Sequence, residues 1–193
     1  MSASITIRIP AWVDFVFAWP VMVYRRRKYG FAFRKIYVGE GLFAKISPMD
    51  YYWLSSLKWS VTGKDGKFYA VRGVRTGPRE IKLRSMQREI MKAIKGKLVD
   101  HRNAESLDNH RENLRLATRS QNSYNRQKTK TKKSSSKYRG VTYFARARKW
   151  VARIKYQGKS RWLGYFEKEE DAARAYDAAA LKYYREFARL NFV

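Results

Sequence analysis

Residues 99–122, VDHRNAESLDNHRENLRLATRSQN, combine side chains that could act on a phosphodiester bond. They contain both histidines of the chain, two aspartates and four asparagines, set among basic residues. A hard cation such as Mg²⁺ or Mn²⁺ takes oxygen ligands and stabilises the leaving oxygen of such a bond. Asp100 and Asn122 can supply these oxygens. His101 can take a proton from the attacking water, because imidazole titrates near neutral pH.

Three further residues of this stretch have expected roles. A general base needs a partner that fixes its tautomer, and Asn113 is expected to orient His101 through a hydrogen bond. Arg119 can hold the scissile phosphate. His110 lies in the loop, and we expect it to be solvated rather than a ligand. The alternative for the whole stretch is that its polar residues only cap turns in a basic domain.

These residues can form one site only if the local elements bring them together. The sequence predicts a strand over 96–101, a long polar loop, a second strand over 113–117 and a helix over 118–126 with Thr118 as its N-cap. Adjacent side chains of a strand point to opposite faces, so Asp100 and His101 can share a site only near the end of their strand. Asn122 lies one helical turn after Arg119, and Asn125, one turn further, is the substitute ligand.

The pattern VDH…LDN…ENLRLATRSQN resembles the HNH, or ββα-metal, motif of homing-type endonucleases of phages and bacteria. The resemblance covers roughly residues 81–126. It implies His101 as general base, Asn113 as the residue that orients it, and Asp100 with Asn122 as metal ligands. The chain departs from the common pattern at Gln87, where many members have histidine, and at Ala104, which replaces a turn glycine.

Residues 138–193 predict three strands followed by an alanine-rich helix, EKEEDAARAYDAAALKYYREF. Apolar side chains recur along this helix at helical spacing and predict one face packed on the sheet; they are Ala172, Ala173, Tyr176, Ala179, Ala180 and Tyr183. From about Lys137 onward the sequence resembles the APETALA2/ethylene-response-factor (AP2/ERF) DNA-binding domain. The resemblance implies a three-stranded antiparallel sheet that lies in the major groove with the helix behind it.

Strand alternation predicts which residues of 149–156 face the DNA. Trp150, Ala152 and Ile154 would face the helix, whereas Val151, Arg153 and Lys155 would face outward. By resemblance, the DNA contacts include Arg139, Arg153, Lys155 and Trp162. The sequence adds three further arginines as expected contacts to phosphate or bases, Arg146, Arg148 and Arg161.

The segments around these two motifs complete the expected organisation of an α+β chain. Residues 127–137 contain no apolar side chain, which predicts a basic linker that buries nothing. Its Lys130, Lys132 and Lys133 would follow a phosphate backbone. Residues 10–28 predict an arm packed on the body, with contact to a membrane surface as the alternative, and Ser47 is the expected N-cap of a following helix. The expected domains are an N-terminal region 1–80, a nuclease 81–126, the linker 127–137 and a DNA-binding domain 138–193.

The composition fits nucleic acid as the partner. Lys plus Arg number 43 against 16 Asp plus Glu, for a net charge of +27, and such a field attracts polyanions. The absence of cysteine excludes disulfides and thiolate zinc sites. The sequence therefore predicts a Mg²⁺- or Mn²⁺-dependent HNH endonuclease that nicks double-stranded DNA as a monomer, without a membrane, in the cytoplasm of a bacterial or phage-infected cell. The alternative is a sequence-specific DNA-binding protein with a decayed nuclease site.

Overall fold

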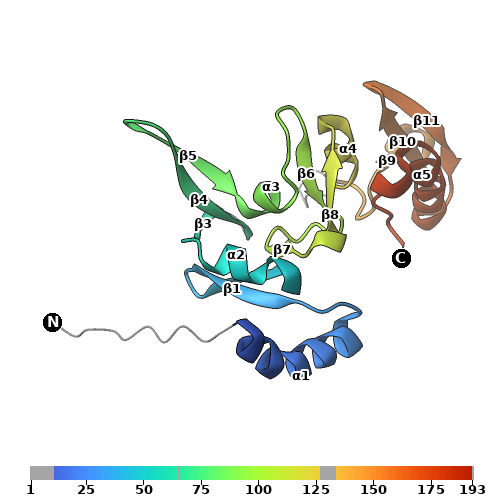
Figure 1. Ribbon diagram of the computed structural model, residues 1–193. Helices are drawn as coiled ribbons and strands as arrows, with labels where there is room; N and C mark the ends of the chain where they lie inside the picture. The colour runs from blue at the N-terminus through green and yellow to red at the C-terminus, as the bar shows by residue number, and fades with distance from the viewer. Residues whose placement is uncertain (1–10, 65, 127–133, 193) are drawn as a thin grey trace. The chain divides into compact units, whose positions relative to one another are not determined.

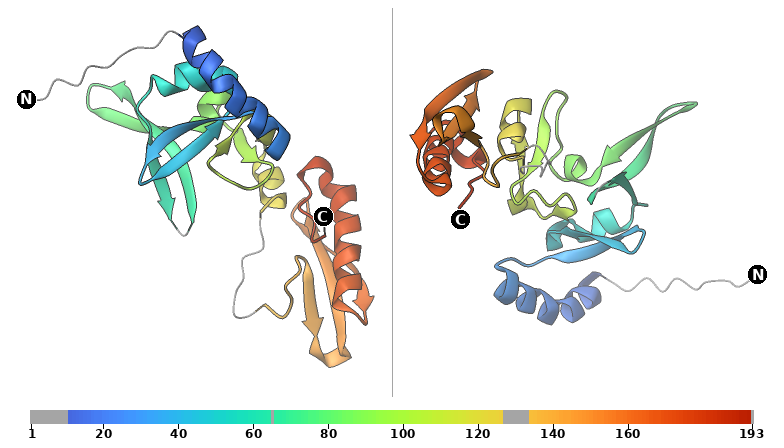
Figure 2. Two further views of the ribbon diagram at one scale, coloured as in Figure 1. Left: turned by 90° about the horizontal axis from the view of Figure 1, so that it is seen from below. Right: turned by 180° about the vertical axis from the view of Figure 1, so that it is seen from behind.

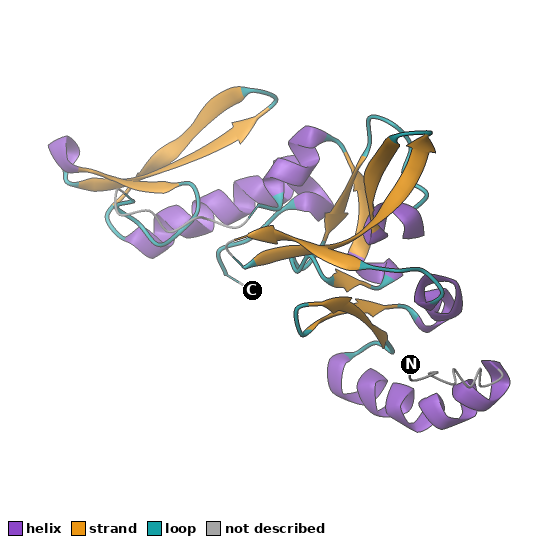
Figure 3. Ribbon diagram, turned by 90° about the vertical axis from the view of Figure 1, so that its left-hand side faces the viewer, coloured by secondary structure: helices purple, strands orange, loops and turns teal. Residues whose placement is uncertain are grey.

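A computed structural model describes residues 11–64, 66–126 and 134–192 (Figure 1). The chain divides into two compact units. The first comprises Met1–Ala93 and Glu105–Arg115, and the second Ile94–Ala104 and Leu116–Val193. Small, mostly antiparallel sheets alternate with helices in the described residues, so the expected α+β class is confirmed (Figure 3).

The first unit is built around two small sheets. β1 (Arg34–Gly39) and β2 (Leu42–Ile46) form an antiparallel hairpin, and the short β7 (Asp108–Asn109) pairs in parallel with β2. The second sheet consists, in this order, of β3 (Ser60–Lys64), β4 (Lys67–Gly77) and β5 (Glu80–Ser85). The core of the unit collects side chains from both sheets and from the short helices, among them Val38, Ala44, Ile46, Leu54, Ala70, Met86 and Ile90.

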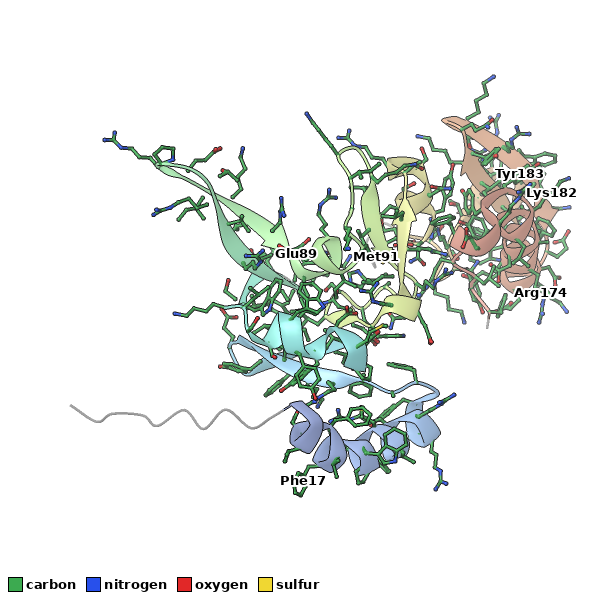
Figure 4. All side chains as sticks on the ribbon, in the orientation of Figure 1. Phe17, Glu89, Met91, Arg174, Lys182 and Tyr183 are labelled. Atoms are coloured by element: carbon green, nitrogen blue, oxygen red, sulfur yellow. The ribbon has the colours of Figure 1, made fainter. Side chains whose placement is uncertain are left out.

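The N-terminal arm is α1 (Ala11–Tyr29). Both carboxylate oxygens of Asp14 accept from the Arg34 guanidinium, at 2.5 and 3.0 Å, and this hydrogen bonding lowers the pKa of Asp14. Met22 is buried, whereas Phe17 is 77% exposed and points away from the unit (Figure 4). The arm therefore packs on the first unit as expected, through a few side chains such as Asp14 and Met22. In the described part of the chain, no helix combines the length and the apolar character needed to cross a membrane.

The expected helix after Ser47 begins as a single 3-10 turn, Pro48–Asp50, and continues as α2 (Tyr51–Ser55). Ser47 occupies the N-cap position, but its hydroxyl does not cap the helix. It accepts instead from the backbone N–H of Arg111 at 2.9 Å, and the Arg111 side chain forms a two-pronged ion pair with the buried Asp50. These contacts fasten the segment after β7 to the first unit.

β3, β4 and β5 precede the short α3 (Met86–Ile90). The ion pair between Arg72 of β4 and Glu89 of α3, 2.9 Å long, ties this sheet to the helix.

The second unit contains the elements expected for the ββα motif and for the C-terminal sheet, except that the first two residues of the second motif strand, Leu114 and Arg115, belong to the first unit. β6 (Leu98–His101) and β8 (Leu114–Ala117) form a two-stranded sheet, and α4 (Arg119–Tyr124) packs against β6. The C-terminal sheet has the order β11-β10-β9, with β9 (Val141–Phe144), β10 (Lys149–Tyr156) and β11 (Lys159–Phe166). α5 (Glu169–Tyr184) lies along this sheet (Figure 2).

The packing of α5 follows the predicted apolar face, with one extension. Ala172, Ala173, Tyr176, Ala179 and Ala180 are buried as expected, and Tyr183 is partly buried. The face continues to Tyr184, which is also buried and donates its hydroxyl to the carbonyl oxygen of Lys155 at 2.6 Å. Burial raises the pKa of the Tyr184 phenol, which therefore stays a neutral donor.

Two expectations about burial in the second unit are wrong. Val151 was expected to face outward, yet it is 5% exposed, because it sits on the central strand between Thr142 and Tyr165. Ser136 was assigned to a linker that buries nothing, yet it is buried and donates to Glu169 of α5 at 2.6 Å. A small hydroxyl side chain can be buried when it finds a charged acceptor.

Candidate active site and DNA-binding surface

Asp100 and His101 end β6, and both are buried. The chain turns directly after them: the backbone N–H of Ala104 donates to the carbonyl oxygen of His101 at 2.9 Å. Ala104 adopts a φ of +63°, the left-handed conformation that a glycine adopts without strain. The turn predicted at the end of this strand is therefore present, and the alanine occupies a position that favours glycine.

α4 begins with a complete capping box. The Thr118 hydroxyl accepts from the backbone N–H of Gln121, and the Gln121 side chain accepts from the backbone N–H of Thr118. Two N–H groups that the helix itself cannot satisfy are thereby paired. The expectation that Thr118 is the N-cap is confirmed, and the start of α4 is fixed by local sequence.

Asn125, the C-cap residue of α4, joins this helix to the end of β6. Its amide nitrogen lies 3.1 and 3.2 Å from the two carboxylate oxygens of Asp100 and 2.7 Å from the carbonyl oxygen of His101. Asn122 precedes Asn125 by three residues and so lies on the same face of the helix. Arg119, a further turn back and exposed, shares that face. From the sequence, Asn125 was expected only as a substitute metal ligand, and its contact with Asp100 was not predicted.

The donor set at this end of β6 fits a hard divalent cation. Asp100 offers carboxylate oxygens and Asn122 an amide oxygen, the ligand types that Mg²⁺ and Mn²⁺ prefer. Among the described residues, no group of three or more His, Cys, Asp or Glu side chains could hold a metal. A cation here would therefore complete its coordination with amide oxygen, water and phosphate, as Mg²⁺ commonly does.

His110 differs from the expectation of a solvated side chain. It is 8% exposed, its ring stacks on Phe31 at a centroid distance of 3.9 Å, and its Nδ1 lies 2.5 Å from a carboxylate oxygen of Asp108. The reason is the pairing of β7 with β2, which draws this part of the loop into the first unit. His110 thus has a structural environment, and the expectation that it is solvated is wrong.

Two other residues of the motif are buried in the first unit. The side-chain amide of Asn113 donates to the carbonyl oxygen of Asp108 at 2.7 Å, so its part in orienting His101 stays a prediction. Gln87 of α3 is also buried, and no donor in the described part of the chain reaches its Oε1. A buried acceptor without a partner is costly, and this one sits at the position where the motif commonly has histidine.

The C-terminal sheet exposes a basic face. Arg153 and Lys155 of β10 are exposed, and Trp162 of β11, directly opposite Arg153, is 59% exposed. Trp162 is therefore outside the core, whereas Trp150 packs against it as expected. Arg146 and Arg148 are exposed at the turn between β9 and β10.

The other expected DNA contacts are placed differently. The Arg139 guanidinium donates to the carbonyl oxygens of Ser123, Tyr124 and Arg126 at 3.1, 2.6 and 2.6 Å, and so closes the C-terminal end of α4. Arg161 pairs with Ile154, on the face that α5 covers, and its guanidinium lies 5.1 Å from the ring centre of Tyr183. DNA contacts by these two arginines stay predictions. Lys130, Lys132 and Lys133 lie outside the described residues.

α4 also makes an aromatic contact with the C-terminal region. The rings of Tyr124 and Tyr184 stack at 3.8 Å between centroids, with an interplanar angle of 8°. This contact could not be predicted from the sequence, because a lone tyrosine at the end of a short helix does not indicate which residue it will pack against. The role of Asp177 was also not predicted. This residue is buried and accepts hydrogen bonds from the backbone and side chain of Asn191.

Comparison with known proteins shows that this chain is similar to two different classes of protein. The family model described as HNH endonuclease matches residues 94–124, which include β6, β8 and α4. The match contains Asp100, His101, Asn113, Arg119 and Asn122. The middle of the chain is therefore similar to HNH endonucleases.

The second class comes from curated relatives. The AP2-like ethylene-responsive transcription factor TOE2 of Arabidopsis thaliana is 48% identical over 59 residues, 31% of this chain and 12% of that protein. APETALA2-like protein 2 of Oryza sativa subsp. indica is 47% identical over 58 residues, 30% of this chain and 13% of that protein. The chain thus spans about an eighth of the length of these relatives. No solved structure matches it. The resemblance to AP2/ERF-type sequences is confirmed.

Proposed function

We propose that this protein is a homing-type DNA endonuclease that hydrolyses one phosphodiester bond with one divalent cation and is targeted by its C-terminal sheet. The observation that carries the proposal is the Asn125 contact, which holds the end of β6 against α4. This contact lies beside the residues that match HNH endonucleases. It supports a shared site for Asp100, His101 and Asn122, because all three lie on the two elements that it joins.

The proposed roles follow from the chemistry of each side chain. His101 takes the proton of the attacking water, and Asn113 orients its imidazole. Asp100 and Asn122 hold the cation, and Arg119 holds the scissile phosphate. When bound, Mg²⁺ or Mn²⁺ would stabilise the charge that develops on the leaving oxygen. One such site in a monomer predicts a nick rather than a double-strand break.

Targeting is proposed for the C-terminal sheet. Arg153 and Lys155 project from one exposed face together with Trp162, and Arg can read guanine while Lys mostly meets phosphate. The proposed partner is double-stranded DNA, and the proposed place of action is the DNA of a bacterial or phage-infected cell.

The test is the nicking of supercoiled plasmid by the full chain with Mg²⁺, with Mn²⁺ and with EDTA. We expect open-circular product with either cation and none with EDTA. Equal nicking in EDTA would contradict the metal-dependent mechanism. Gel-shift measurement in EDTA on the same preparation reports DNA binding separately from cleavage.

A second candidate function is DNA binding with a decayed nuclease. Two observations favour it: the Oε1 of Gln87 is buried without a donor in the described residues, and Ala104 holds a backbone conformation that favours glycine. This candidate predicts tight, salt-sensitive DNA binding with no nicking under any cation. Recovery of nicking in Gln87→His together with Ala104→Gly would identify these two positions as the cause.

A further inference from the structure

The outer part of the β3-β4-β5 sheet is a ribbon of only two strands. β3 pairs with β4 from Lys67 to Val71, and β5 pairs with β4 from Val71 to Gly77. Beyond Val71 no third strand flanks the pair in the described residues, and every residue of β5 except Ser85 is exposed. The ribbon projects away from α3 and β3 in opposite views of the molecule (Figures 1 and 2).

The ribbon is strongly basic. From Arg72 to Ser85 there are five Lys and Arg side chains and one acidic side chain, Glu80. Arg72 and Arg84 are directly opposite each other, an arrangement of like charges that destabilises a strand pair. Arg72 has Glu89 as its ion-pair partner, but no acidic side chain of the described residues pairs with Arg75, Arg79 or Arg84. An anion from outside the chain would offset this repulsion.

The face of the ribbon that carries Arg75 also exposes apolar side chains. Ile81 and Leu83 are each 66% exposed, and they are paired with Arg75 and Gly73. A side chain at Gly73 would meet the Cγ2 atom of Ile81 at 2.9 Å, so the glycine lets Ile81 lie across the ribbon. A two-stranded ribbon is marginally stable alone, and a partner that covered Ile81 and Leu83 would stabilise it by burying their apolar area.

We propose that the β4–β5 ribbon is a second DNA-contacting element, which lies in the major groove of the duplex that the enzyme cuts. This inference rests on the proposed function for the identity of the ligand. The major groove, about 12 Å wide, admits a two-stranded β-ribbon. The six residues from Arg72 to Gly77, five of which are paired with β5, give the ribbon a length of about 20 Å. A second copy of the ribbon is a poor occupant, because two basic ribbons repel each other.

The test measures DNA affinity of the full chain in EDTA as a function of salt. The triple variant Arg75→Gln, Arg79→Gln, Arg84→Gln removes three unpaired charges from the ribbon. The matched control Arg26→Gln, Arg27→Gln, Lys28→Gln removes three exposed charges from α1 of the same unit. Equal far-UV circular dichroism and thermal midpoints show that both variants are folded.

We expect the ribbon variant to reduce the slope of log affinity against log salt by about 2 to 3, since each neutralised phosphate contributes about 0.9. The control should change the slope by less than half of this. In hydroxyl-radical footprinting, the ribbon variant should lose protection over one segment of the site. A reduced salt slope and a lost footprint segment in the ribbon variant support the proposal even if the parent never nicks DNA. Absence of nicking by the parent would contradict only the proposed function.

Three results would overturn the inference. One is a ribbon variant with the parent slope and footprint, even if nicking is intact. Another is an equal loss of slope in the control, which would indicate binding by net charge alone. The third is a parent that sediments as a dimer and a ribbon variant that sediments as a monomer, which would make a second copy the occupant.

Discussion

The side-chain amide of Asn125 lies within hydrogen-bond distance of both carboxylate oxygens of Asp100, so the end of α4 and the end of β6 are held as one element. The same amide nitrogen also contacts the carbonyl oxygen of His101. One neutral side chain thereby positions a proposed metal ligand and a proposed general base without competing with the cation by charge.

Asn125→Ala should lower both stability and cleavage. It leaves the buried Asp100 carboxylate and the His101 carbonyl without this donor, a loss that costs about 1–3 kcal/mol. Urea unfolding and plasmid nicking measure the two effects. The control is Ser123→Ala on the exposed side of α4, where a change within about 0.5 kcal/mol is expected. An Asn125→Ala variant with parental stability and cleavage would show that the contact does not position the site.

His101→Ala should abolish cleavage and leave DNA affinity nearly unchanged. Loss of a general base costs about 10²–10⁴ in rate, whereas affinity depends on the basic surfaces. The chain has one other histidine, His110, whose contacts with Phe31 and Asp108 are structural. His110→Ala should lower the unfolding midpoint but retain cleavage well below that midpoint. The assignment fails if His101→Ala cuts within about threefold of the parent, far inside the range for a general base.

Ala104→Gly should stabilise the protein. An L-residue in the left-handed conformation costs about 1–2 kcal/mol, part of which glycine recovers. We expect the free energy of unfolding to rise by about 1 kcal/mol. Ala178→Gly on the exposed face of α5 should change it in the opposite sense by about 1 kcal/mol. Denaturant melts of both variants check the sign, and destabilisation by Ala104→Gly would contradict the conformation of this turn.

The stack of Tyr124 on Tyr184 should be measurable as a coupling between α4 and α5. In a double-mutant cycle with Tyr124→Leu and Tyr184→Leu, the two losses of stability should be non-additive by about 0.5–1.5 kcal/mol. The pair Tyr124→Leu and Leu181→Ala is the control, because the exposed Leu181 makes no ring contact in the described structure. Strict additivity in the first cycle would show that α4 does not rest on α5 in solution.

Arg153→Ala should relax the base preference at particular positions of the DNA target. Removal of a base-reading arginine costs about 1–3 kcal/mol on the correct site and less elsewhere. Replacing Lys130, Lys132 and Lys133 with Gln should instead weaken all sequences alike and flatten the salt dependence. Selection from one randomised duplex pool compares the two variants. A uniform loss of affinity in Arg153→Ala would place base reading elsewhere.

Local sequence determined those parts of this protein whose partners lie within a few residues along the chain. The Thr118–Gln121 capping box, the strand end at Asp100 and His101, the alternation of Ile154 with Arg153 and Lys155, and the alanine face of α5 could all be predicted. Helix caps and strand alternation depend on short-range geometry, and residue spacing encodes that geometry directly.

Only the tertiary structure decided which distant groups meet. Asn125 contacts a residue 25 positions away, and Arg139 closes the end of α4 instead of projecting freely from the sheet. His110 is buried because β7 pairs with β2, more than 60 residues earlier in the chain. A polar side chain in the sequence shows which bonds it can make but not which donor or acceptor will be brought to it. That choice belongs to the packing of whole elements, because burial requires each polar group to find its partner there.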